Sequence, residues 1–202
     1  MTPELELQYK TLIKARNFHY ENLNKWLTFF YVAIGAMFAG FCSIHASKTP
    51  DPQLEIVVVA VLYLVCICAY LSCKGYYYWE NHWIMLLHDF ENRHLNNGIQ
   101  DYRVYAVFAN KKNLDQPYNL IKGANVSTTK VSLFLTFMLA VISGAILAYW
   151  ITKETGCLCP ECELHNIFVA IMESSVVTTI LALIGMATLK SNLRNLTDKE
   201  LK

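Results

Sequence analysis

The chain of 202 residues is strongly apolar and almost neutral: 54% of its residues are hydrophobic, 16% are charged and the net charge is +1. Because an ordinary soluble domain carries about 25% charged residues, this chain lacks the polar side chains that keep a surface in water. Its Lys and Arg residues form no stripe that would neutralise phosphates, so no nucleic-acid partner is expected. The composition predicts a membrane protein with lipids as partners.

The first 25 residues are polar and charged, without the short basic segment and apolar run that mark a cleavable signal peptide. The first apolar helix is therefore expected to be retained. Apolar side chains recur in this segment at spacings of three and four, which predicts an amphipathic helix that continues into the first apolar stretch. The stripe includes Leu5, Tyr9, Leu12, Tyr20 and Leu23.

Four apolar stretches are long enough to cross a bilayer, whose hydrocarbon core of about 30 Å requires about 20 helical residues. They cover about residues 26–45, 54–73, 131–151 and 167–189, and none contains Lys, Arg or Pro. The predicted fold is an all-α integral membrane protein with four transmembrane helices. Residues 1–202 are expected to form a single four-helix membrane domain.

The distribution of basic residues predicts the orientation. Of the 17 Lys and Arg residues, all but Lys48 and Lys153 lie before the first span, between the second and third spans, or after the fourth. Basic residues concentrate on the cytoplasmic side of membrane proteins. Both termini are therefore expected in the cytoplasm, with a cytoplasmic helical part formed by residues 1–25 and 74–130.

After the second span, apolar side chains keep the helical spacing from Tyr76 to Phe90. The helices on either side of the turn at residues 46–53 would each contain about 42 residues, or roughly 63 Å, about twice the hydrocarbon thickness. We therefore expect the first two helices to extend into the cytoplasm as a long antiparallel hairpin.

The segment that leaves the second span is rich in aromatic residues. One interpretation is an aromatic belt at the lipid headgroups. The other is a cytoplasmic interface for a second subunit, a lipid headgroup or a small ligand. The candidate residues of that interface are Lys74, Tyr76, Trp79, His82 and Trp83.

Glu173 is an acidic residue inside the fourth span, and Ser174 and Thr178 follow it closely. A carboxyl group in the bilayer is costly unless it faces protein or water, so these residues are a candidate intramembrane polar site. The alternative is a protonated carboxyl that holds neighbouring helices together.

The loop between the third and fourth spans contains Cys157, Cys159, Cys162 and His165. The predicted orientation places this loop outside the cytoplasm, where oxidising conditions favour disulfides. Thiolate and imidazole also suit zinc or copper. A disulfide, a metal site and thiols without a role remain as alternatives, and no other cofactor is expected.

Several segments resemble the RipA family of bacterial inner-membrane proteins. They are "KARNFHYENLNKWLTFFYVAIGAMFAGF", "SCKGYYYWENHW", "RVYAVFANK" and "GANVSTTKVS", spread over residues 14–132. A more distant resemblance is to SLATT-type membrane modules. The first resemblance implies a multi-pass protein of the bacterial cytoplasmic (inner) membrane that assembles into an octamer and acts in envelope homeostasis or as a host-survival factor. The second implies a membrane effector of phage defence.

The common nucleotide-binding, hydrolase and metalloprotease motifs are absent, so no enzyme is predicted. The expected function is a non-enzymatic homo-oligomeric scaffold or pore-like assembly whose main partner is a second copy of the chain. The alternatives are the phage-defence effector and an envelope metal or redox sensor that uses the loop from Cys157 to Cys162.

Overall fold

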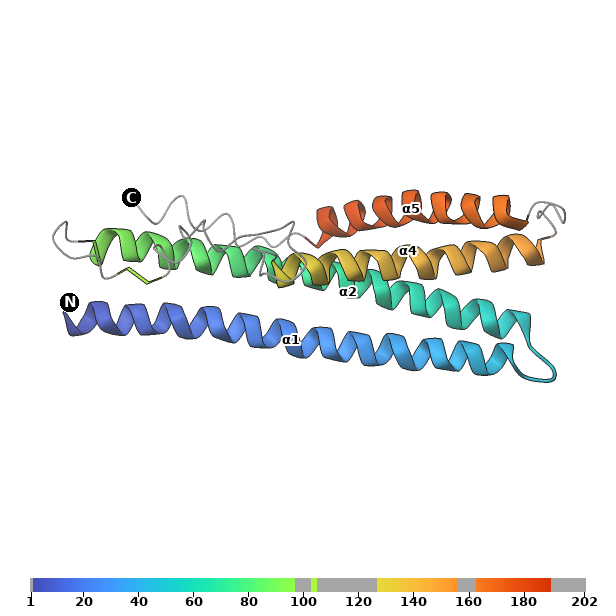
Figure 1. The fold of residues 1–202 in the computed structure, drawn as a ribbon, viewed down its shortest axis with the longest axis horizontal. Helices are drawn as coiled ribbons and strands as arrows, with labels where there is room; N and C mark the ends of the chain where they lie inside the picture. Colours follow the sequence, from blue (N-terminus) through green and yellow to red (C-terminus); the bar gives the residue numbers. More distant parts are fainter. Residues whose placement is uncertain (1, 97–102, 105–126, 156–162, 190–202) are drawn as a thin grey trace, which may run out of the picture. The chain divides into compact units, whose positions relative to one another are not determined.

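The computed structural model describes residues 2–96, 103–104, 127–155 and 163–189. In these residues every regular element is an α-helix: α1 (Pro3–His45), α2 (Pro52–His94), α4 (Thr128–Glu154) and α5 (Glu163–Thr188) (Figure 1). All four contain a segment long and apolar enough to cross a membrane. The predicted fold class, an all-α protein with four spans, is confirmed.

The ends of the helices follow local sequence signals. Asp51 is the N-cap of α2, because its Oδ1 accepts hydrogen bonds from the backbone N–H groups of Gln53 (3.0 Å) and Leu54 (3.3 Å). Pro52 then occupies the first helical position, where a missing N–H costs nothing. Ser127 caps α4 in the same way through the N–H of Lys130, at 3.3 Å. Because α1 ends at His45 and α2 begins at Pro52, the turn between them is only a few residues long.

The chain divides into two compact units, and α1, α2 and α4 each contribute to both. Unit 1 comprises Met1–Tyr31 and Ser72–Leu135, and unit 2 comprises Val32–Leu71 and Thr136–Lys202.

The core of unit 1 joins α1 to α2. Leu23, Leu27 and Cys73 are buried together, and Tyr31, Tyr76 and Leu133 pack against them. Nearer the start of α1, Tyr9 stacks on Phe90 with a ring separation of 5.7 Å. The described parts of α1 and α2 in this unit therefore run antiparallel over several helical turns.

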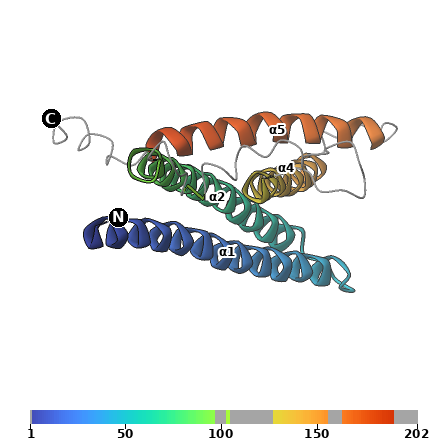
Figure 2. The same ribbon diagram turned by 60° about the vertical axis from the view of Figure 1, so that its left-hand side comes forward.

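The core of unit 2 contains side chains from three helices. Ile34 of α1 packs with Leu62, Tyr63 and Cys66 of α2 and with Ala140 of α4. Helix α5 lies beside α4 (Figures 1 and 2). A hydrogen bond from the Ser174 hydroxyl to the carbonyl oxygen of Val141, 2.7 Å long, joins these two helices.

Gly144 of α4 marks the closest approach in unit 2. A Cβ atom at this position would collide with the Ser174 hydroxyl and would lie 2.9 Å from Cε2 of Tyr63. Only glycine lets the three helices pack this closely, as small residues commonly do between membrane helices. Gly35 and Gly40 of α1 differ, because an added Cβ would meet no atom within 4 Å in this chain.

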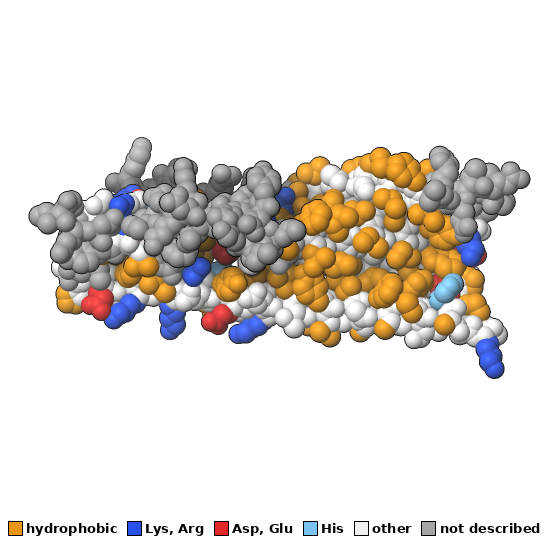
Figure 3. Space-filling model, viewed as in Figure 1, with side chains coloured by type: hydrophobic (Ala, Val, Ile, Leu, Met, Phe, Trp, Pro, Cys, Tyr) orange, Lys and Arg blue, Asp and Glu red, His pale blue; other side chains and the backbone are white. Residues whose placement is uncertain are grey.

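The surfaces of the two units differ in composition. Basic and acidic side chains lie on the visible surface of α1 in unit 1, whereas hydrophobic side chains cover the visible surface of α4 and α5 in unit 2 (Figure 3). Exposed large hydrophobic side chains of α5 include Phe168, Met172, Val176, Ile180 and Leu183. Such a continuous apolar surface is covered by lipid or by other protein.

Candidate functional site

The predicted intramembrane site divides into an inner and an outer part. Ser174 and Thr178 are buried, and they lie four residues apart, so they share one face of α5. Thr178 Oγ1 forms a hydrogen bond of 2.9 Å with the hydroxyl of Tyr63 on α2. With the bond from Ser174 to α4, these contacts join three helices through polar groups that lipid would leave unsatisfied. Ser174 and Thr178 therefore act in packing within the subunit.

Glu173 lies on the outer surface of α5 and is exposed. One residue of helix corresponds to a rotation of about 100°, so Glu173 points to a different side of α5 from the buried Ser174. Within the described residues, its carboxyl forms no hydrogen bond or ion pair. The three predicted residues are therefore not one cluster, and Glu173 alone is available to groups outside the subunit.

The aromatic segment of α2 packs around a histidine that the sequence analysis did not select. The His19 ring of α1 is stacked 6.5 Å from Trp79 and lies 5.7 Å from Trp83. Exposed His82 contacts the same two rings edge-on, at 5.8 and 6.3 Å. His19 shares the predicted apolar side of the first helix with Leu12 and Leu23, which is the signal that would have found it.

The other candidates in this segment differ in their surroundings. Tyr76 packs against the core of unit 1, and its burial raises the pKa of the phenol above its usual 10.0. Lys74 is half-buried. Nδ1 of His19 and Nε1 of Trp83 are buried without a hydrogen-bond partner among the described residues, although such groups are usually paired. The segment is thus a packed aromatic cluster, and of its predicted residues only His82 is exposed.

Two buried carboxyl groups were missed by the sequence analysis. Glu55 sits in the first turn of α2, 3.3 Å from Nδ1 of His45. Glu91 accepts a 2.7 Å hydrogen bond from the hydroxyl of Tyr9 and a 3.3 Å bond from the backbone N–H of Val104. The sequence signal for Glu55 was an acidic residue at the start of an apolar helical segment, whereas Glu91 stands among polar residues and had no such signal.

The predicted disulfide or metal site falls on residues that the structure does not describe. Cys157, Cys159 and Cys162 lie outside the described residues, as does the side chain of His165. No disulfide joins the cysteines of the described part, Cys42, Cys66, Cys68 and Cys73. In the described part, no three His, Cys, Asp or Glu side chains are grouped as a metal site would require. Disulfide, zinc and copper all remain predictions.

The four apolar helices and the polar contacts between them define a multi-pass membrane protein. The sequence model of the Octameric membrane protein family (8xMP) matches residues 6–152, and the chain belongs to this family. The match includes most of α1, all of α2 and nearly all of α4, whereas α5 lies beyond it. It confirms the resemblance to a RipA-like octameric membrane family, and with it a homo-oligomeric membrane assembly. No curated protein and no solved structure matches the chain.

Proposed function

We propose that the chain forms a non-enzymatic, pore-like octamer of the bacterial cytoplasmic membrane, with both termini in the cytoplasm. The observation that supports this function is the exposed carboxyl of Glu173 on a membrane-spanning helix. The orientation follows from the basic residues, which favour the cytoplasmic side. The role proposed for such an assembly is envelope homeostasis or host survival, which the resemblance to the RipA family implies.

Glu173 lies six residues into the predicted fourth span, or about 9 Å along the helix. Its neighbours on the outer face of α5, Val176, Val177 and Ile180, are exposed apolar residues. A carboxyl in contact with lipid at this depth would be costly, so it should face water or another protein chain. In an octamer with α5 around the axis, eight copies of Glu173 would line a hydrated path.

A ring of carboxylates in a pore attracts cations and repels anions. The apolar residues on the same face would form a constriction beside the ring. Apolar constrictions lose water readily, which closes a pore to ions. The proposed activity is therefore cation conduction through a gated, mostly apolar opening.

The test reconstitutes the purified full chain into liposomes and measures both its mass and the flux of K⁺ and Cl⁻. An octamer that conducts K⁺ in preference to Cl⁻, and that loses this preference in Glu173→Gln, would support the proposal. The matched control is Thr179→Val, because Thr179 is also exposed on α5 but its hydroxyl already bonds to the carbonyl oxygen of Ser175, at 2.7 Å. An octamer without flux would instead be a sealed scaffold.

The orientation has its own test. A reporter that works only in the cytoplasm should be active when it is fused after Lys202. Activity of an extracytoplasmic reporter at this position would overturn the proposed orientation and the placement of the loop from Cys157 to Cys162.

A further inference from the structure

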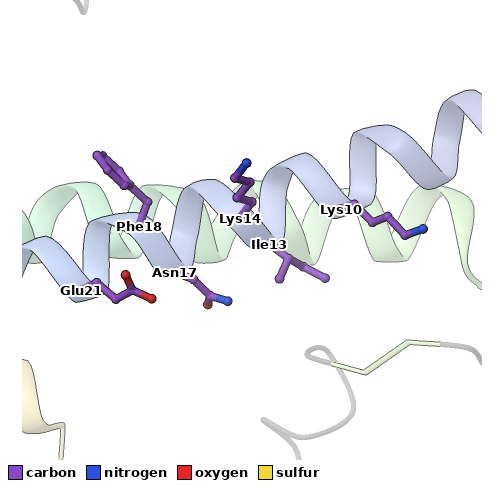
Figure 4. Close-up of a pocket in the computed structure, with 6 residues that line it drawn as sticks. All are labelled: Lys10, Ile13, Lys14, Asn17, Phe18 and Glu21. Carbon is purple, nitrogen blue, oxygen red and sulfur yellow. The ribbon is translucent and has the colours of Figure 1, made fainter.

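A surface groove runs along α1 in unit 1. It is walled by two rows of side chains with a spacing of about four residues, Lys10, Lys14 and Phe18 in one row and Ile13, Asn17 and Glu21 in the other (Figure 4). Rows of this spacing are the ridges of a helix, and the groove between them can receive a ridge of another helix. The groove has a volume of about 440 Å³. Phe18, at one end, is 59% exposed.

A ridge of α2 has the complementary shape. Met85 is 71% exposed, more than any other large hydrophobic side chain described in unit 1. Asn81 and Asp89, four residues before and after it, continue the same ridge. A methionine side chain is flexible and fills irregular apolar gaps well.

The groove and the ridge both face away from the contact between α1 and α2. Tyr9, His19 and Leu23 form the side of α1 that meets α2, and the groove lies on the far side of that helix. Likewise Trp83 and Leu87 are on the inner side of α2, whereas Met85 is exposed. A chain therefore cannot place its own Met85 in its own groove.

The two surfaces lie at the same level of unit 1. His19 packs between Trp79 and Trp83, and Tyr9 packs on Phe90. Met85 lies between these two contacts along α2, so it is level with the middle of the groove, near Lys14 and Asn17. Copies that share one orientation in the membrane would present the ridge and the groove to each other at equal height.

We infer that the Met85 ridge of one copy packs into the α1 groove of the next copy in the octamer. This inference rests on the octameric assembly in the proposed function. Because the groove and the ridge are different surfaces, the contact is head-to-tail, and its repetition can close a ring. The occupant is a second copy and not lipid, because Phe18 precedes the first predicted span and Met85 follows the second.

Charge and polarity agree with this pairing. Asp89 on the ridge, whose carboxylate pairs with Arg93 of its own helix at 2.9 Å, is level with the part of the groove that carries Lys10 and Lys14. Lys10 pairs with Glu6 of its own helix. Lys14 forms no ion pair within the described residues, so it is available to a carboxylate of the neighbouring copy. The alkyl stems of both lysines would cover the Met85 side chain while their ammonium groups stay in water.

The first test uses a photo-crosslinker in membranes. Phe18 is replaced by p-benzoylphenylalanine in the full chain, and the crosslinked peptides are identified by mass spectrometry after irradiation. The expected result is an adduct between two copies that maps to residues 81–89. An adduct between the α1 helices of two copies, or no adduct between copies, would overturn the inference.

The second test distinguishes a head-to-tail contact from a symmetric one. Phe18→Asp and Met85→Asp should each abolish the octamer, measured as mass in detergent. An equal mixture of the two variants should form dimers of one chain of each kind, because each pair keeps one intact contact. Ile84→Asp is the control: Ile84 is exposed too but lies about 100° around the helix from Met85, so its octamer should persist.

Persistence of the octamer in Phe18→Asp and Met85→Asp, or failure of the crosslink, would refute the contact without affecting the proposed octamer. A wild-type chain that is not octameric would instead refute the assembly on which the inference depends. Loss of the preference for K⁺ over Cl⁻ in Glu173→Gln is measured separately, so the two proposals fail by different results.

Discussion

Gly144→Ala should destabilise the protein, because the added Cβ would collide with the Ser174 hydroxyl and lie 2.9 Å from Cε2 of Tyr63. Overpacking of this kind typically costs about 1–3 kcal/mol. Moving Ser174 would also weaken its 2.7 Å hydrogen bond to Val141, worth about 1 kcal/mol. The higher helix propensity of alanine recovers about 1 kcal/mol. The net loss should be about 1–3 kcal/mol.

The assay is unfolding of the purified protein in a mild detergent, followed by circular dichroism as the denaturing detergent increases. Gly35→Ala is the matched control, since it is also a glycine in an apolar helix but an added Cβ there meets no atom within 4 Å. It should be as stable as the wild type or more so. If Gly144→Ala were no less stable than Gly35→Ala, the close packing of α2, α4 and α5 at this glycine would be wrong.

Two further predictions follow from buried hydroxyl groups. Tyr63→Phe removes the 2.9 Å hydrogen bond to Thr178 and should lower the free energy of unfolding by about 0.5–1.5 kcal/mol, measured in the same unfolding assay; no change would show that the bond contributes nothing. For Tyr76, burial raises the folded pKa above 10.0, so the unfolded chain loses its proton first and stability falls as the pH rises above 10. Tyr76→Phe should make the melting temperature decline less steeply in this range, and an unchanged decline would contradict the shift.

The sequence alone was sufficient for the number of spans and for the helical fold. A membrane segment must satisfy all its backbone hydrogen bonds internally, so a run of about 20 apolar residues has one regular solution, the α-helix. The predicted spans therefore agree with the helices of the structure, apart from Leu189, one residue after the end of α5. The aromatic segment after the second span was also recognised, because its spacing is helical.

Only the tertiary structure decided which way the polar side chains face. Glu173, Ser174 and Thr178 look like one site in the sequence, yet two are buried and Glu173 is exposed. The burial of Glu55 and Glu91 and the position of His19 against Trp79 and Trp83 depend in the same way on contacts between distant parts of the chain. Hydrophobic periodicity shows which side of a helix is apolar, but the partners of that side are chosen by the packing of all the helices together.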